Sequence, residues 1–79
     1  MEMREIIEQT LISYVNKVIG TNFTIKDEDK WLLKDFSFDS LDFINLAIFI
    51  ESEYQILIKF DKDMRIQDVA EIINTGKDN

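Results

Sequence analysis

Neither cysteine nor histidine occurs in this chain of 79 residues. Without cysteine, the chain has no disulfide, no thiolate nucleophile and no cysteine metal site. Without histidine as well, it cannot assemble the usual pairs of a nucleophile and a base. It also lacks an apolar run long enough to span a membrane, and acidic residues rather than a basic, apolar signal follow Met1. We therefore expect no enzyme, no membrane insertion and a cytoplasmic location.

Apolar residues make up 46% of the chain, enough for one small domain that folds alone. Sixteen acidic and nine basic residues give a net charge of −7, which repels nucleic acid and favours basic protein partners. No Lys or Arg occurs between Asp35 and Ile58, although five acidic residues fall there. Solubility alone also explains an acidic face, so both interpretations stay open.

Apolar spacing predicts an all-α fold, a small four-helix bundle with three longer helices and one short one. We expect a single domain over residues 1–79. The helices are expected at about 3–19, 40–54, 61–65 and 68–75, with a long loop over about 20–39. The apolar side chains scattered through that loop suggest that it is pinned onto the core, with a short helical turn near Trp31. Residues 55–60 are expected to be extended, with Ile56 and Ile58 facing inward.

The helix predicted over 40–54 is apolar on almost every side. Its core face is expected to comprise the following residues: Phe43, Leu46, Ala47, Ile50 and Tyr54. Leu41, Ile44, Ile48 and Phe49 lie at the edge of the opposite face or within it. Full burial of such a helix is hard to arrange in a small domain, which favours a partner that covers the second face.

Ser40 lies at the start of this helix, in the stretch SFDSLDF. Either Asp39 or Ser40 can cap the helix by accepting bonds from free backbone N–H groups. The same groups, with the positive end of the helix dipole, would stabilise a phosphate esterified to Ser40. The chain offers no base to activate the hydroxyl, so another enzyme would have to attach the group.

The stretch FSFDSLDFINLAIFIESEY resembles the second helix of acyl carrier proteins, a family that carries 4′-phosphopantetheine on the serine of its D-S-L motif. Asp35 and Phe36 match the family's Asp-Leu before the motif. The similarity continues without a gap through the extended I-x-I segment, Ile56 and Ile58, to the start of the last helix. Before Asp35, only length and pattern agree.

The resemblance implies that 4′-phosphopantetheine from coenzyme A is attached covalently to Ser40 by a phosphopantetheinyl transferase, with Asp39 and Leu41 beside it. The arm's thiol would carry an acyl chain as a thioester. Other implied partners are acyl-transferring, ketosynthase or acyl-activating enzymes with basic docking surfaces; we expect a monomer. The implied partner-binding residues are Asp35, Asp39, Leu41, Asp42, Ile44, Asn45, Ile48 and Phe49. The candidates for an acyl pocket, equally explained as ordinary core, are Phe43, Leu46, Ala47, Ile50, Ile58, Met64 and Ile66.

Several positions depart from the fatty-acid carriers. Ser37 replaces the usual glycine two residues before the Asp of the motif, and Asn45 replaces a partner-binding Glu. These differences leave fatty-acid, polyketide and related pathways open, together with an aminoacyl, peptidyl or D-alanyl carrier and an unmodified acidic docking module. No metal site is expected, because neither Asp27 with Asp29 nor Asp61 with Asp63 belongs to a calcium loop.

Overall fold

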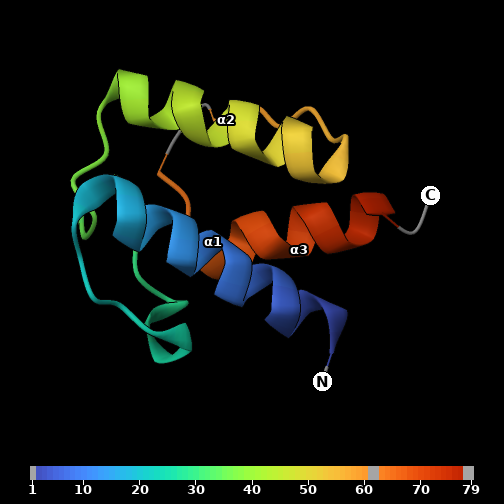
Figure 1. Cartoon of the computed structure of the whole chain (residues 1–79), viewed down its shortest axis with the longest axis horizontal. Coiled ribbons are helices and arrows are strands. Elements are labelled where there is room, and N and C mark those ends of the chain that lie inside the picture. The colour runs from blue at the N-terminus through green and yellow to red at the C-terminus, as the bar shows by residue number, and fades with distance from the viewer. Residues whose placement is uncertain (1, 61–62, 78–79) are drawn as a thin grey trace.

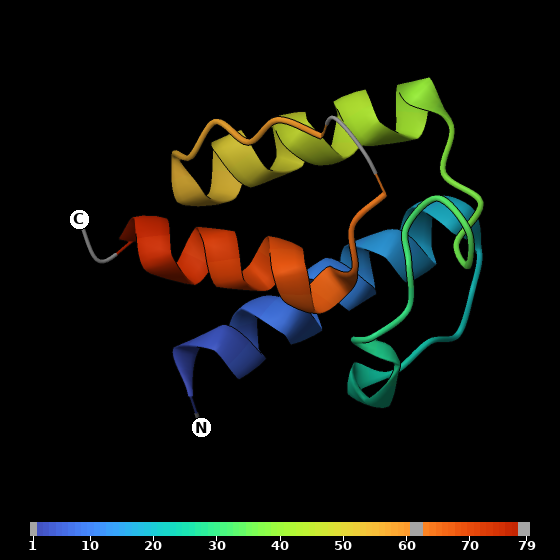
Figure 2. The ribbon, with the colours of Figure 1, turned by 180° about the vertical axis from the view of Figure 1, so that it is seen from behind.

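The computed structural model describes residues 2–60 and 63–77. It contains three α-helices, α1 (Met3–Ile19), α2 (Ser40–Tyr54) and α3 (Ile66–Lys77), and a short 3-10 helix, η1 (Ile25–Asp27). No β-strand occurs among these residues, which confirms the all-α class. In Figure 1, α2 lies across one side of the crossed pair α1 and α3, and Figure 2 shows the same arrangement from behind.

The core is formed by one apolar face of each α-helix. Helices α1 and α3 pack closely, and the core cluster comprises Ile7, Leu11, Ile12, Val15, Leu32, Phe36, Phe38, Leu46, Ile50, Ile66, Val69, Ala70 and Ile73. In α1, Ile7, Leu11, Ile12 and Val15 are buried, whereas Ile6 and Val18 are exposed. Gly20 ends α1 with a left-handed φ of 82°, a conformation that glycine adopts without steric cost.

The long connection from α1 to α2 is anchored by its own apolar side chains, as predicted. Leu32, Phe36 and Phe38 are buried, and the ring of Phe23 packs edge-on against Phe36 at 4.4 Å between centroids. The only helical segment in this connection is η1, which lies before the turn expected near Trp31. At that position, the structure has a turn closed by the N–H of Asp35 and the carbonyl of Trp31.

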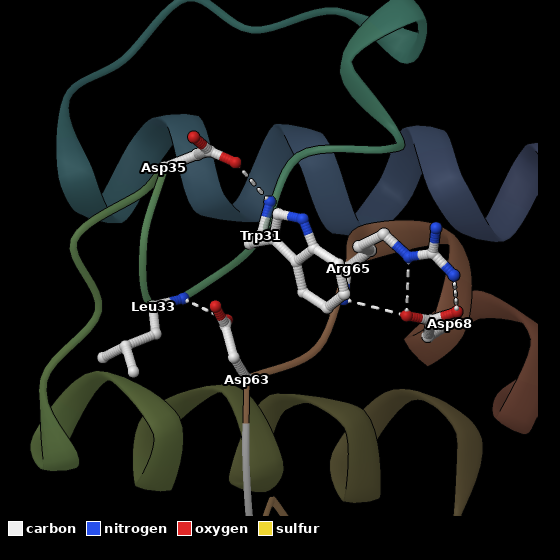
Figure 3. A network of polar contacts seen from close by, with 6 residues as sticks. All are labelled: Trp31, Leu33, Asp35, Asp63, Arg65 and Asp68. Carbon is white, nitrogen blue, oxygen red and sulfur yellow. Dashed lines mark hydrogen bonds and ion pairs between the residues drawn. The ribbon is translucent and has the colours of Figure 1, made fainter.

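A network of polar contacts fastens this connection to the start of α3 (Figure 3). Trp31 and Arg65 form an isolated antiparallel bridge, and the Arg65 guanidinium lies 5.0 Å from the centroid of the Trp31 ring. The N–H of Leu33 donates to Asp63 at 2.8 Å, and Arg65 pairs with Asp68 at 3.0 Å. The network therefore holds the segment just before α2 against a segment that follows α2 in the sequence.

Gln55 ends α2 in the left-handed conformation, so the prediction of an extended segment is wrong at this residue. Residues 56–60 have no regular secondary structure, and half-buried Ile56, Ile58 and Phe60 alternate with exposed Leu57 and Lys59. The short helix predicted over 61–65 is not confirmed: residues 61 and 62 lie outside the described part, and residues 63–65 are not helical. Helix α3 begins at Ile66 instead of 68, because Asp68 accepts the N–H of Arg65 and so closes the first turn. Gly76 lies within α3 rather than beyond it, and its missing Cβ leaves room for Ile56.

Candidate functional site

The start of α2 is closed by a reciprocal pair of aspartates. Asp39 has extended backbone angles and accepts the N–H of Asp42 at 2.9 Å, while Asp42 accepts the N–H of Asp39 at 3.0 Å. This is a capping box in which Asp42 takes the place of the usual Glu or Gln. The helix is therefore capped by Asp39 and not by Ser40.

Ser40 is the first residue of α2, and it is exposed to solvent. Within residues 2–60 and 63–77, its hydroxyl has no hydrogen-bond partner, and the N–H groups of Ser40 and Leu41 have no acceptor. Free N–H groups are expected at the first positions of a helix, where no preceding turn supplies a carbonyl. The arrangement places an accessible hydroxyl beside free donors and the positive end of the helix dipole, which suits a phosphate ester.

The position of Ser40 is fixed by the residues that precede it. Phe38 is 3% exposed, donates its N–H to the carbonyl of Leu32 at 3.1 Å, and packs edge-on against Phe43 at 5.1 Å. One residue earlier, Ser37 adopts a left-handed φ of 59°, where a glycine would be unstrained. Phe38 was not among the predicted site residues; the signal for it was the alternation of Phe36 and Phe38 before the motif.

Three predicted docking acids are also structural. The carboxylate of Asp35 accepts the N–H of Trp31 at 2.7 Å, and Asp39 and Asp42 form the capping box. Asp35 and Asp39 remain exposed, Asp42 and Asn45 are half-buried, and Ser40 lies among them. No Lys or Arg occurs from residue 36 to residue 57, so all charged residues in this stretch, which includes the whole of α2, are acidic.

An apolar strip continues from Ser40 along the outside of α2. Leu41, Ile44 and Ile48 are 63%, 56% and 60% exposed and follow one another at helical spacing. Phe49 differs from them because its ring stacks on Tyr14 of α1, at 4.2 Å between centroids. The structure thus brings three of the four predicted apolar docking residues into one exposed strip and places the fourth against α1.

The candidates for an acyl pocket lie on or against the core. Leu46, Ile50 and Ile66 are buried, whereas Phe43, Ala47, Ile58 and Met64 are half-buried. A surface pocket of about 560 Å³ lies elsewhere, where Tyr14 and Phe49 meet, and none of the seven candidates lines it. Six of the seven belong to the core cluster or pack against it, and Ala47 is half-buried.

Of three comparisons with known proteins, only the comparison of sequences found relatives. No family model matched the chain, and no solved structure matched it. Acyl carrier proteins from Rickettsia canadensis, Rickettsia massiliae and Rickettsia prowazekii are each 32% identical over 78 residues, covering 99% of this chain and 91% of the relative. The chain belongs to the acyl carrier protein family. Acyl carrier proteins are carriers and not enzymes, and the family carries a phosphopantetheine group.

The start of α2 fits the group that acyl carrier proteins hold, because Ser40 has an exposed, unbonded hydroxyl beside free N–H donors. Among the described residues, no three metal-ligating side chains come together; Asp61 lies outside this part of the chain. Nor does any helix that the structure describes have both the length and the apolar character to cross a membrane.

Proposed function

We propose that this protein carries acyl intermediates on a 4′-phosphopantetheine attached to Ser40, in fatty-acid biosynthesis. A phosphopantetheinyl transferase would join Ser40 Oγ to the phosphate of 4′-phosphopantetheine, with the nucleotide part of coenzyme A as the leaving group. When bound, the group supplies a thiol that holds an acyl chain as a thioester. The observation that carries the proposal is that Asp39 caps α2 and leaves the Ser40 hydroxyl free.

The chain's own residues would place and present the group. The buried Phe38 and the capping box fix where α2 begins, and the free N–H groups of Ser40 and Leu41 would stabilise the phosphate. Asp39 and Asp42 would attract basic docking surfaces, where charge speeds encounter more than it strengthens binding. A tethered acyl chain would then meet a docked enzyme at high effective concentration.

The proposed partners are the transferase and acyl-transferring, ketosynthase or acyl-activating enzymes with basic docking surfaces. We propose that they contact Asp35, Asn45 and the exposed strip of Leu41, Ile44 and Ile48, with Phe49 at its edge. We further propose that the protein acts as a monomer in the cytoplasm. Neither the aminoacyl carrier nor the unmodified docking module is favoured, since the eight curated relatives are all named acyl carrier proteins.

We also propose that an acyl chain is sheltered where the seven half-buried and buried candidates pack, from Phe43 to Ile66. Leu46, Ile50 and Ile66 are buried in the core cluster, so sheltering an acyl chain requires these side chains to move apart. Loading an eight-carbon acyl group should shift the methyl resonances of Leu46 and Ile50 more than those of the exposed Ile48. Equal small shifts at all three positions would place the acyl chain outside the core.

The decisive experiment is the intact mass of the protein before and after incubation with coenzyme A, Mg²⁺ and a broad-specificity phosphopantetheinyl transferase. We expect a gain of one phosphopantetheinyl group in the wild type and none in Ser40→Ala. Ser52→Ala is the matched control, because Ser52 is a second exposed serine on α2. Absence of a gain with several transferases, in protein shown by circular dichroism to be folded, would contradict the proposal.

A further inference from the structure

Glu8 is a buried carboxylic acid in the middle of a surface helix. The sequence places it with Glu2 and Glu5 near the start of α1, where an acidic side chain suits the helix dipole. In the structure it is 1% exposed, and within the described residues its Oε2 has no hydrogen-bond partner. Glu28, the residue that ends η1, lines the same pocket. Two carboxylates that share a pocket, one of them buried, repel each other unless a proton lies between them.

The charges around Glu8 do not neutralise it. Glu8 lines a pocket of about 510 Å³ whose other charged residues are Glu2, Arg4, Glu5, Lys26, Glu28 and Asp29. Helix α3 contributes only the neutral Gln67. Burial, followed by the charge and hydrogen bond of Glu28, raises the pKa of Glu8 to about 7, although Arg4 opposes the shift. Protonation of Glu8 is thus accessible near neutral pH.

Glu28 connects three parts of the fold. Its backbone N–H donates to Ile25 within η1, and its carbonyl accepts the N–H of Gln67 at the start of α3 at 2.9 Å. Its side chain lines the same pocket as Glu8 of α1. A proton shared by the two acids would therefore tie α1 to η1 at a residue that is already tied to α3.

We propose that one proton shared by Glu8 and Glu28 acts as a latch that holds residues 24–30 against α1, and that its loss at mildly alkaline pH releases this segment. In the latched state, the O–H of protonated Glu8 donates to the carboxylate of Glu28. Loss of the proton leaves two facing carboxylates and a buried charge. The release stops at Trp31, because its bridge to Arg65 and the contacts in Figure 3 hold the remainder of the connection.

The test combines stability with amide exchange in the whole protein from pH 5.5 to 8, with EDTA present to exclude divalent cations. An acid whose pKa is raised on folding contributes its full stability below the ordinary value of 4.5 and loses it as pH rises toward 7. The folding equilibrium constant of the wild type should therefore fall roughly 10- to 30-fold over this range from this pair alone. Amide exchange, corrected for its intrinsic pH dependence, should accelerate at Lys30 and Gln67 before it does in the core of α1.

Glu8→Gln supplies an amide that donates to Glu28 at every pH. We expect this variant to lose most of the pH-dependent fall in the folding equilibrium constant and to be more stable than the wild type at pH 8. Glu51→Gln removes one exposed acid on α2 and should retain the wild-type profile. Glu28→Gln is the second variant and should flatten the profile in the same way. Parallel profiles for the wild type and both latch variants would overturn the proposal, as would exchange at Lys30 and Gln67 that does not respond to pH.

Discussion

The division of roles between Asp39 and Ser40 makes a quantitative prediction. Asp39→Ala removes the oxygen that accepts the Asp42 N–H, so the free energy of unfolding should fall by about 1 kcal/mol, within a range of about 0.5–2 kcal/mol. Ser40→Ala removes a hydroxyl that makes no hydrogen bond, and alanine is the better helix former. Its effect should lie between zero and a gain of about 0.5 kcal/mol.

These changes are large enough to measure in a domain of this size. A loss of about 1 kcal/mol corresponds to a fall in Tm of roughly 4–8 °C, or a urea midpoint lower by about 0.5–1 M. Urea unfolding followed by circular dichroism at 222 nm suits the helical fold. Asp39→Asn is the control, because asparagine keeps a capping oxygen and removes only the charge.

A double-mutant cycle with Asp42→Ala tests the reciprocal bonds. Each single change already breaks the capping box. The double variant should therefore lose less free energy of unfolding than the sum of the two single losses. If Ser40→Ala destabilised the protein as much as Asp39→Ala, the hydroxyl would be structural. The main support for Ser40 as an attachment site would then be lost.

Three further predictions concern the surroundings of the site. Ser37→Gly should stabilise the protein by up to about 1 kcal/mol in urea unfolding, because relief of the left-handed φ exceeds the entropy that glycine adds to the unfolded chain; a loss of stability would contradict this. Phe49→Ala should cost about 2 kcal/mol in the same assay, through the lost apolar contact and the lost stack on Tyr14, whereas Phe49→Leu, which keeps apolar volume and loses the stack, should cost less; equal losses would exclude a contribution from apolar contact. Arg65 lowers the pKa of Asp68 through a hydrogen bond, so Asp68→Asn should cost less than about 1 kcal/mol at pH 6, since both side chains are about a third exposed. That difference should shrink as the pH falls through the lowered pKa of Asp68 and vanish once the carboxyl is protonated in both states; a difference that does not change with pH would contradict the ion pair.

Much of α2 was predictable because its packing follows the helical period. Leu46 and Ile50 face the core, and Leu41, Ile44 and Ile48 remain outside, as the wheel of residues 40–54 indicates. The place of Ser40 at the start of this helix was predictable for the same reason. Which residue caps the helix was not predictable, because aspartate and serine are almost equally good caps. The extended backbone at Asp39, held by the buried Phe38 just before it, decides the choice.

The failures arise where the deciding contact does not show in the apolar pattern of the sequence. The sequence gives no sign that Glu8 is buried, because a charged residue near a helix start usually faces water, but in the structure it is 1% exposed and lines a pocket with residues of η1. Helix α3 begins early because Asp68 reaches back to Arg65, a geometry that spacing alone does not show. For Glu8 the deciding contact comes from a segment far away in the sequence, and for α3 it comes from the orientation of one side chain.

The placement of the chain ends has a practical consequence. The beginning of α1 and the end of α3 lie at the end of the molecule remote from the start of α2, as both ribbon views show (Figures 1 and 2). A bead, a fluorescent protein or a flexible linker fused at either terminus would therefore be spaced from Ser40 by the length of the helical body. Such a fusion would leave the serine facing outward, so immobilised protein should remain open to a modifying enzyme and to the enzymes that follow it.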